Sequence, residues 1–275
     1  LSTVCLIGCG STDDLNQSGG DSNTPPDTPG AMDMSFVPPK PIGNSDAGHS
    51  VGDPCNLWAN VEDQRLLSKL HEELKNSYRP ISADPDFGGT LNRYTTARKM
   101  MFTQVERFQS PDGPYIVECV YTGMTAPAPQ TEDPNRDLVN CEHVMPRARM
   151  GDKVSQPILY SHQQSDIHNL LPATPGSNST RGSFPFGRVV RSRNLDHMPS
   201  ILGESASGQT VWEPRSERRG DVARITFYMS VRWGFDIGSE EEATLRDWNR
   251  NDPPDNRETI RNQSIAGLQG NRNPF

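Results

Sequence analysis

A chain of 275 residues can hold one large domain or two small ones. Its net charge of -8 argues at first against a polyanionic partner, because nucleic-acid grooves use Lys and Arg to replace counterions. The charge is unevenly distributed, however. Residues 1–50 carry six acids and one base, whereas residues 143–232 carry twelve Lys and Arg against seven Asp and Glu. The acidic total therefore does not exclude a nucleic-acid substrate for the middle of the chain.

The first residues form a short apolar run that ends in Leu6-Ile7-Gly8-Cys9. This run resembles the lipobox of a bacterial lipoprotein signal, in which the cysteine, here Cys9, becomes the lipidated first residue of the mature protein. The alternative is an ordinary apolar leader, or a buried strand, that contains a cysteine. No stretch of about 18 apolar residues occurs, so the sequence predicts no transmembrane helix and a membrane contact through the lipid alone.

Residues 10–52 are rich in Ser, Gly, Asp, Asn, Thr and Pro. Such a composition buries too little apolar surface to offset the entropy of the chain, so we expect a disordered tether. The simplest division is a signal remnant over 1–9, the tether over 10–52 and one folded domain over 53–275.

Three cysteines remain when Cys5 is lost with the signal and Cys9 is lipidated. An exported protein permits disulfides. Cys119 and Cys141 lie in two segments that we expect to be neighbouring strands, which makes them the candidate disulfide and leaves Cys55 as the odd thiol. No Cys-x-x-Cys spacing occurs, so a zinc site is not predicted.

The hydrophobic pattern of the domain predicts an α+β fold that is mostly helical. Helices are indicated by apolar residues that recur every three to five positions, and strands by short runs of β-branched and aromatic residues. In chain order we expect helices over 57–78 and 95–108, strands over 115–121 and 137–141, a turn with a short helix near 163–172, and helices over 221–233, 240–249 and 257–268.

The second predicted strand runs directly into Glu142-His143. Phosphodiester hydrolysis needs a base that is neutral near pH 7, which a histidine supplies, and a divalent cation held by oxygen ligands. Adjacent residues at a strand end point in opposite directions, so the carboxylate can face a metal while the imidazole faces the attacking water. An acid beside a histidine is usually a surface pair, so this dipeptide alone predicts little.

Several ordered motifs accompany the dipeptide and together cover residues 55–275. They resemble the bacterial extracellular and periplasmic endonuclease I family, of the His-Me finger (ββα-metal) superfamily. The resemblance implies a domain built around a ββα-metal motif. The motifs are Arg98-Lys99-Met100-Met101-Phe102-Thr103, Cys119-Val120-Tyr121-Thr122-Gly123, Asn140-Cys141-Glu142-His143-Val144-Met145-Pro146, Ser165-Asp166-Ile167-His168-Asn169-Leu170-Leu171-Pro172, Asn178 with Arg181-Gly182, Phe184-Pro185-Phe186-Gly187, Arg219-Gly220-Asp221-Val222-Ala223-Arg224, Phe227-Tyr228-Met229, and the closing run from Arg261-Asn262 to Gln269-Gly270-Asn271-Arg272-Asn273-Pro274-Phe275.

The resemblance also implies roles for three residues. His143 would be the general base that activates water, and Glu142 and Asn178 would hold one divalent metal. All of these ligands are oxygen atoms, which suits Mg²⁺, with Ca²⁺ or Mn²⁺ as alternatives. The products would carry 5′-phosphate ends. Without the resemblance, Asn178 would be read as a turn residue.

Arginines are the candidates for phosphate contacts. The resemblance suggests Arg181, Arg219 and Arg224, although Arg219-Gly220-Asp221 is equally the start of a helix. Some family members carry a phosphate-binding arginine in a longer insertion with a disulfide, but here the stretch 147–164 is short and lacks cysteine. Arg147 and Arg149 are the candidate substitutes. Asp166-x-His168 is either an auxiliary pair or a structural one.

The sequence thus predicts a metal-dependent, sequence-nonspecific endonuclease that acts on DNA and, as a second substrate, RNA. We expect a monomer that is exported to the cell envelope or beyond, with contacts made mainly to phosphates. The alternative is an inactive nucleic-acid-binding surface lipoprotein on the same fold, against which the retention of Glu142, His143 and Asn178 argues. A site-specific endonuclease of the HNH type would need a DNA-reading module, and neither zinc-ligand pairs nor a basic helix is present.

Overall fold

The computed structural model describes residues 63–82, 93–111, 113–128 and 135–275. The predicted lipobox with Cys9, the tether over 10–52 and Cys55 lie outside these residues and stay predictions. Within the described ranges, no helix combines the length and the apolar character that crossing a membrane requires.

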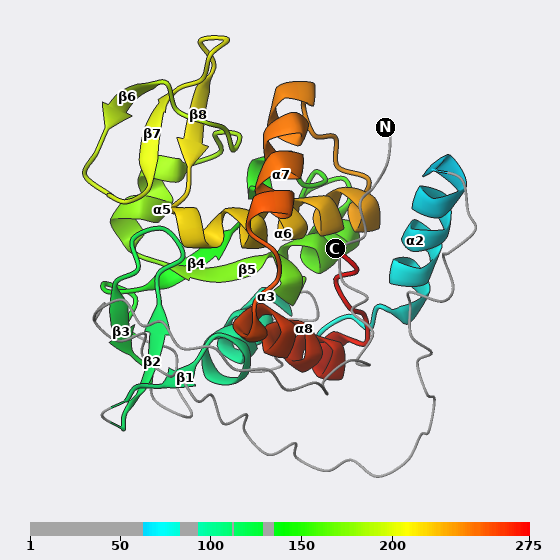
Figure 1. Cartoon of the computed structure of the whole chain (residues 1–275). Helices are drawn as coiled ribbons and strands as arrows, with labels where there is room; N and C mark the ends of the chain where they lie inside the picture. The colour runs from blue at the N-terminus through cyan, green and yellow to red at the C-terminus, as the bar shows by residue number, and fades with distance from the viewer. Residues whose placement is uncertain (1–62, 83–92, 112, 129–134) are drawn as a thin grey trace, which may run out of the picture.

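Helix α6 (Arg219–Trp233) crosses the middle of the domain, and two further helices pack on it (Figure 1). These are α7 (Ser239–Asn251), which lies across α6, and α2 (Asp63–Ser77) on the far side from the sheets. Ten residues of α6 are buried, including Val222 and Met229, so this helix contributes a large part of the core. The other helical segments are α3 (Arg93–Met100) with the π-turn Met101–Val105, α4 (Pro157–Gln164), α5 (Pro175–Arg181), α8 (Asn256–Gln269) and the 3-10 turns Arg147–Arg149, Ile167–Asn169 and Ser216–Arg218.

Three small antiparallel sheets occupy the other side of the domain (Figure 1). The first and third sheets each have three strands in sequential order, and a two-stranded pair lies between them. The strands are β1 (Phe108–Gln109), β2 (Tyr115–Glu118) and β3 (Thr125–Pro127), then β4 (Asn140–His143) and β5 (Leu170–Ala173), then β6 (Arg191–Asn194), β7 (Ile201–Glu204) and β8 (Thr210–Glu213).

The β4–β5 pair and α5 follow one another in the expected ββα order, which confirms the predicted α+β fold class. Glu142 lies opposite Leu171 and His143 opposite Leu170. Proline at the first position of α5 suits a helix start, because the missing N–H would have no partner there. The two predicted catalytic residues therefore sit at the end of a strand that is fixed by a buried neighbour.

Strand β5 is buried at all four positions because it lies between two hydrophobic clusters. Leu171 and Ala173 pack in the cluster that contains Tyr121, Phe186 and Trp212. Leu170 packs in the other cluster, which contains residues of the π-turn and α8. The alternation of side chains along β5 thus joins the two clusters.

A buried network of hydrogen bonds connects the last residues of the chain to the segment before β5. The carboxylate of Asp166 accepts hydrogen bonds from Tyr228 Oη (2.8 Å), Trp233 Nε1 (2.9 Å) and Gln269 Nε2 (2.8 Å). His168 Nε2 lies 3.2 Å from the carbonyl oxygen of Asn271. Asp166 and His168 are both fully buried, so the structure favours the structural reading of this pair.

Three sequence-based expectations are wrong. The strand predicted through Tyr121 ends at Glu118, and the segment near 163–172 contains the strand β5 after its 3-10 turn. The predicted disulfide is absent, since Cys119 and Cys141 are both free thiols. The reason is that β5 lies between them: Cys141 is paired with Pro172 of β5, and Cys119 Sγ accepts from the backbone N–H of Thr174 at its end.

A buried neutral histidine should make the fold sensitive to acid. Burial, with the nearby charge of Arg261, lowers the pKa of His168 to about 3, whereas an unfolded histidine titrates near about 6.5. The unfolded chain therefore binds the extra proton first, and stability is lost as pH falls below about 6.5. We expect His168→Gln to be less stable than the parent at pH 7. Its melting temperature, measured by circular dichroism, should fall less than that of the parent between pH 7 and pH 5. An unchanged pH slope would contradict this assignment.

Candidate active site

A pocket of about 660 Å³ gathers the three predicted catalytic residues. Its walls come from α3, β4, the 3-10 turn that follows β4, and α5. Glu142, His143 and Asn178 all line it, although Asn178 lies far from the other two in sequence. The ββα order brings them together, because α5 returns along the strand pair.

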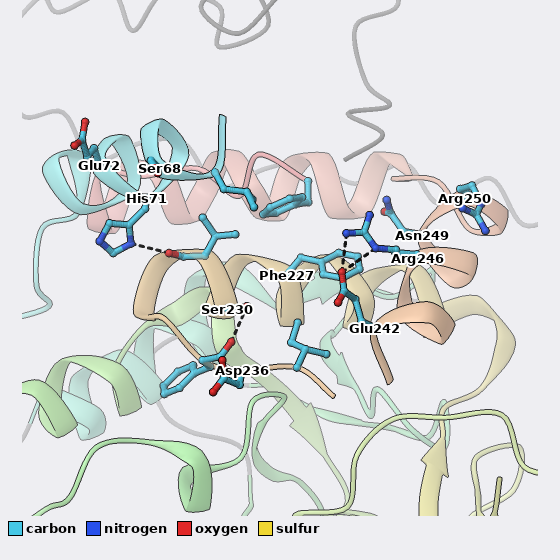
Figure 2. Close-up of a pocket in the computed structure, with 15 residues that line it drawn as sticks. Ser68, His71, Glu72, Phe227, Ser230, Asp236, Glu242, Arg246, Asn249 and Arg250 are labelled. Carbon is cyan, nitrogen blue, oxygen red and sulfur yellow. Dashed lines mark hydrogen bonds and ion pairs between the residues drawn. The ribbon is translucent and has the colours of Figure 1, made fainter. Parts of the chain in front are cut away.

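A second hollow of about 670 Å³ lies between α2, α6 and α7 (Figure 2). Its apolar wall includes Phe227, Val231 and Phe275. Figure 2 shows His71 turned toward the carbonyl oxygen of Val231, from which its Nδ1 lies 2.8 Å away. Arg246 is ion-paired with Glu242 in this hollow. None of the predicted catalytic residues lines this hollow.

Glu142 is anchored through one carboxylate oxygen. Its Oε1 accepts a hydrogen bond from Tyr121 Oη at 2.7 Å and lies 3.4 Å from Arg181 Nη1. The side chain is only 2% exposed, and burial raises the pKa of this carboxyl, while the charge of Arg181 and the Tyr121 hydrogen bond oppose the rise. Both partners stabilise the ionised carboxylate, which is the form that can bind a cation.

His143 points to the other face of the strand. Its Nε2 lies 2.9 Å from the carbonyl oxygen of Gln164, and its ring is 5.1 Å from that of Tyr94. A carbonyl oxygen only accepts, so this contact assigns the proton to Nε2 and leaves Nδ1 as the acceptor. Burial lowers the pKa of His143 to about 4, which keeps the imidazole neutral at pH 7. A neutral imidazole with one nitrogen available as an acceptor is what a general base requires.

Asn178 is held by both hydrogens of its amide group. Its Nδ2 donates to Asn140 Oδ1 at 2.8 Å and to the carbonyl oxygen of Cys141 at 3.1 Å. The amide oxygen is therefore the atom that can accept a cation. Together with the carboxylate of Glu142, it forms a set of hard oxygen donors, which fits Mg²⁺ or Ca²⁺ with water and phosphate oxygens as further ligands.

A site rich in nitrogen or sulfur ligands is not indicated. Across the part of the chain that the structure describes, no three or more His, Cys, Asp and Glu side chains gather in a way that could hold a metal ion.

Arg181, predicted to contact phosphate, lies behind the pocket wall instead. It is 1% exposed, and its guanidinium donates to the carbonyl oxygens of Val144 (2.6 Å) and Gly182 (3.1 Å) and stacks on the ring of Phe186. With its ion pair to Glu142, it fixes the end of β4. Nothing in the local sequence distinguishes such a buried arginine from an exposed one.

Arg219 and Arg224 do not line the pocket. Arg224 is 1% exposed and is ion-paired with Glu258, and its Nη1 donates to the carbonyl oxygen of Asp252 at 2.6 Å, so it braces α6 against α8. Arg219 pairs with Glu213 at 2.8 Å. Because α6 begins at Arg219, the helix-start reading of this motif is the one that the structure favours.

Arg147, the candidate for a phosphate contact, lines the pocket at the start of the 3-10 turn after β4. Two arginines that the sequence reasoning did not assign accompany it, Arg98 of α3 and Arg136. The sequence did point to Arg98, because this residue lies in a motif that resembles the family and on a predicted helix. Three guanidinium groups at one pocket create a positive potential that attracts phosphate.

The chain is similar to known nucleases over part of its length. The family model described as Endonuclease I matches residues 64–275. The chain is 36% identical over 129 residues to an extracellular ribonuclease of Bacillus subtilis, with 40% of this chain and 43% of that protein covered. It is 29% identical over 160 residues to an extracellular deoxyribonuclease of Aeromonas hydrophila, with 54% and 68% covered. It is 26% identical over 156 residues to Endonuclease-1 of Buchnera aphidicola, with 50% and 58% covered.

The alignments thus cover 43%, 68% and 58% of the length of these three relatives. The family match covers more of this chain than the alignments do. It runs from α2 to the last residue and includes Glu142, His143 and Asn178 of the pocket. The chain therefore belongs to the Endonuclease I family.

Proposed function

We propose that the protein is a metal-dependent, sequence-nonspecific endonuclease that hydrolyses phosphodiester bonds of DNA, and of RNA as a second substrate, to leave 5′-phosphate ends. The observation that carries this proposal is the meeting of Glu142, His143 and Asn178 in one pocket with three arginines. Relatives named as deoxyribonuclease and as ribonuclease support both substrate classes.

The arginines bind the nucleic-acid backbone. Arg98, Arg136 and Arg147 line the pocket beside the catalytic group, and guanidinium groups match phosphate oxygens in charge and geometry. Contacts to phosphate carry no sequence information, so cleavage at this pocket has little sequence preference.

His143 takes the proton from the attacking water. Its Nδ1 is the accepting nitrogen, because Nε2–H is bonded to the carbonyl oxygen of Gln164. The same carbonyl stabilises the positive charge that develops on the ring. A pKa of about 4 makes a weak base in the pocket alone, and the negative charge of an entering phosphate raises it toward the useful range.

Glu142 and Asn178 would hold one divalent cation, which we propose to be Mg²⁺, with Ca²⁺ or Mn²⁺ as alternatives. When bound, the cation would supply charge neutralisation on the phosphate and on the departing 3′ oxygen. The support is the donor set: a buried carboxylate whose ionised form Tyr121 and Arg181 stabilise, and an amide whose hydrogens are already used.

We also propose that the protein acts outside the cytoplasm. Relatives carry the names extracellular ribonuclease and periplasmic deoxyribonuclease, which supports export. The lipid anchor at Cys9 is proposed from the N-terminal sequence alone.

His143→Ala tests the chemistry directly. General-base catalysis contributes about 10²- to 10⁴-fold to rate, so nicking of a supercoiled plasmid in Mg²⁺ should fall by about that factor, and EDTA should stop the parent enzyme. The control is His71→Ala on α2, whose side chain lines the other hollow, and it should nick at the parent rate. Undiminished nicking by His143→Ala would overturn the mechanism. Parent protein that binds DNA without nicking it would favour the inactive alternative.

Arg147→Ala tests the phosphate contact. In the His143→Ala background, where bound DNA survives, loss of one phosphate contact should weaken binding equally on duplexes of unrelated sequence and reduce the slope of log K against log salt by about 1. Arg219→Ala, which removes an arginine outside the pocket, should leave that slope unchanged. Equal slopes for the two variants would exclude Arg147 as a phosphate ligand. Binding is measured by fluorescence anisotropy over a salt series.

The anchor has its own test in cells. Metabolic labelling with palmitate should mark the protein, and Cys9→Ser should remove the label, because the thioether can form only at that sulfur. A parent protein that is exported without label contradicts the lipobox reading and leaves the nuclease proposal untouched.

A further inference from the structure

Tyr121 does not line the pocket, yet its hydroxyl reaches the carboxylate of Glu142 from the core. The hydroxyl donates to Glu142 Oε1 at 2.7 Å, and Tyr121 is fully buried. Arg181 Nη1 lies 3.4 Å from the same oxygen. Both partners therefore act on Oε1, on the side of the carboxylate that faces the core.

The Tyr121 side chain has little freedom to leave this position. Its backbone carbonyl accepts a hydrogen bond from Ser200 Oγ at 2.6 Å, and its ring packs edge-on against Trp212 with centroids 5.1 Å apart. The preceding residue, Val120, donates its N–H to the carbonyl oxygen of Pro172 at 2.8 Å. Because Pro172 belongs to β5, and β5 pairs with β4, Tyr121 and Glu142 are fixed to the same pair of strands.

A buried carboxylate needs hydrogen-bond donors if it is to stay ionised. A donor on one oxygen also fixes the rotation of the group, so the second oxygen keeps one direction. Groups that orient a metal ligand in this way raise the affinity for the metal, since less ordering is needed when the ion binds.

We infer that Tyr121 is a positioning residue for Glu142: its hydroxyl holds Oε1 against the core and so presents the other carboxylate oxygen to the pocket that Asn178 lines. The inference rests on the proposed function, because it concerns how this chain would hold a divalent cation. Tyr121 belongs to the motif Cys119-Val120-Tyr121-Thr122-Gly123, but neither that motif nor the similar proteins assign it a role.

Tyr121→Phe is the sharpest variant, because it removes the hydroxyl and keeps the ring that packs against Trp212. The readout is the dissociation constant of Mn²⁺ alone, measured by isothermal titration calorimetry on the full chain without nucleic acid. Loss of a partner that orients a metal ligand typically weakens metal binding by about 10- to 100-fold, and we expect a change of that size.

Tyr228→Phe is the matched control. Tyr228 is also fully buried, and its hydroxyl donates to another buried carboxylate, that of Asp166, at 2.8 Å. Both variants lose a buried hydrogen bond and should melt at lower temperature. Only Tyr121→Phe should bind Mn²⁺ more weakly.

Three outcomes overturn the inference, and they are distinguishable. Parent-like Mn²⁺ affinity in Tyr121→Phe shows that the hydroxyl does not position Glu142. An equal loss in Tyr228→Phe shows that the effect is a general loosening of the fold. A parent protein that binds no Mn²⁺, with Glu142→Gln giving the same trace, removes the proposed metal site itself and the inference with it.

Discussion

The pairing of β4 with β5 is the constraint on which the site depends. Strand β5 is buried along its whole length between two core clusters, so β4 has one register in which its hydrogen bonds are satisfied. In that register, Glu142 meets Tyr121 and Arg181 on one face, and His143 meets Tyr94 and the carbonyl of Gln164 on the other. A shift by one residue would exchange the two environments. The separate roles proposed for Glu142 and His143 thus depend on strand geometry.

Charge counted along the sequence is a poor guide to charge at the pocket. The stretch 143–232 has a local excess of basic residues, yet Arg181 and Arg224, both within it, are 1% exposed and paired inside the protein. Arg98 and Arg136, which precede that stretch, line the pocket. Which guanidinium groups border the pocket follows from tertiary contacts that a charge count does not contain, and Arg98, which borders it, is itself only 8% exposed.

Periodic segments were predicted well because their pattern is local. The three helices α6, α7 and α8 were expected over 221–233, 240–249 and 257–268 and extend at most two residues beyond these bounds. The sheet of β6, β7 and β8 was missed, because β6 reads Arg-Ser-Arg-Asn with three of its four residues exposed and shows no apolar alternation. The candidate catalytic residues follow from the family motifs and not from the pattern of any single segment. The role of Tyr121 was not found, since its contact with Glu142 joins residues 21 positions apart.

Two buried carboxylates in this protein show how burial serves structure in one place and a candidate chemistry in another. Burial raises the pKa of both Asp166 and Glu142. Asp166 accepts bonds on both oxygens: Oδ1 from Gln269 and the backbone of His168, and Oδ2 from Tyr228 and Trp233. Each carboxylate oxygen of Asp166 thus has two neutral donors, which suits a structural residue that holds the C-terminal segment in place. Tyr121 and Arg181 both reach Glu142 at Oε1, and the residue also borders the pocket. A buried acid that is held on one side and borders a pocket on the other fits the cation ligand that we propose better than it fits a purely structural role.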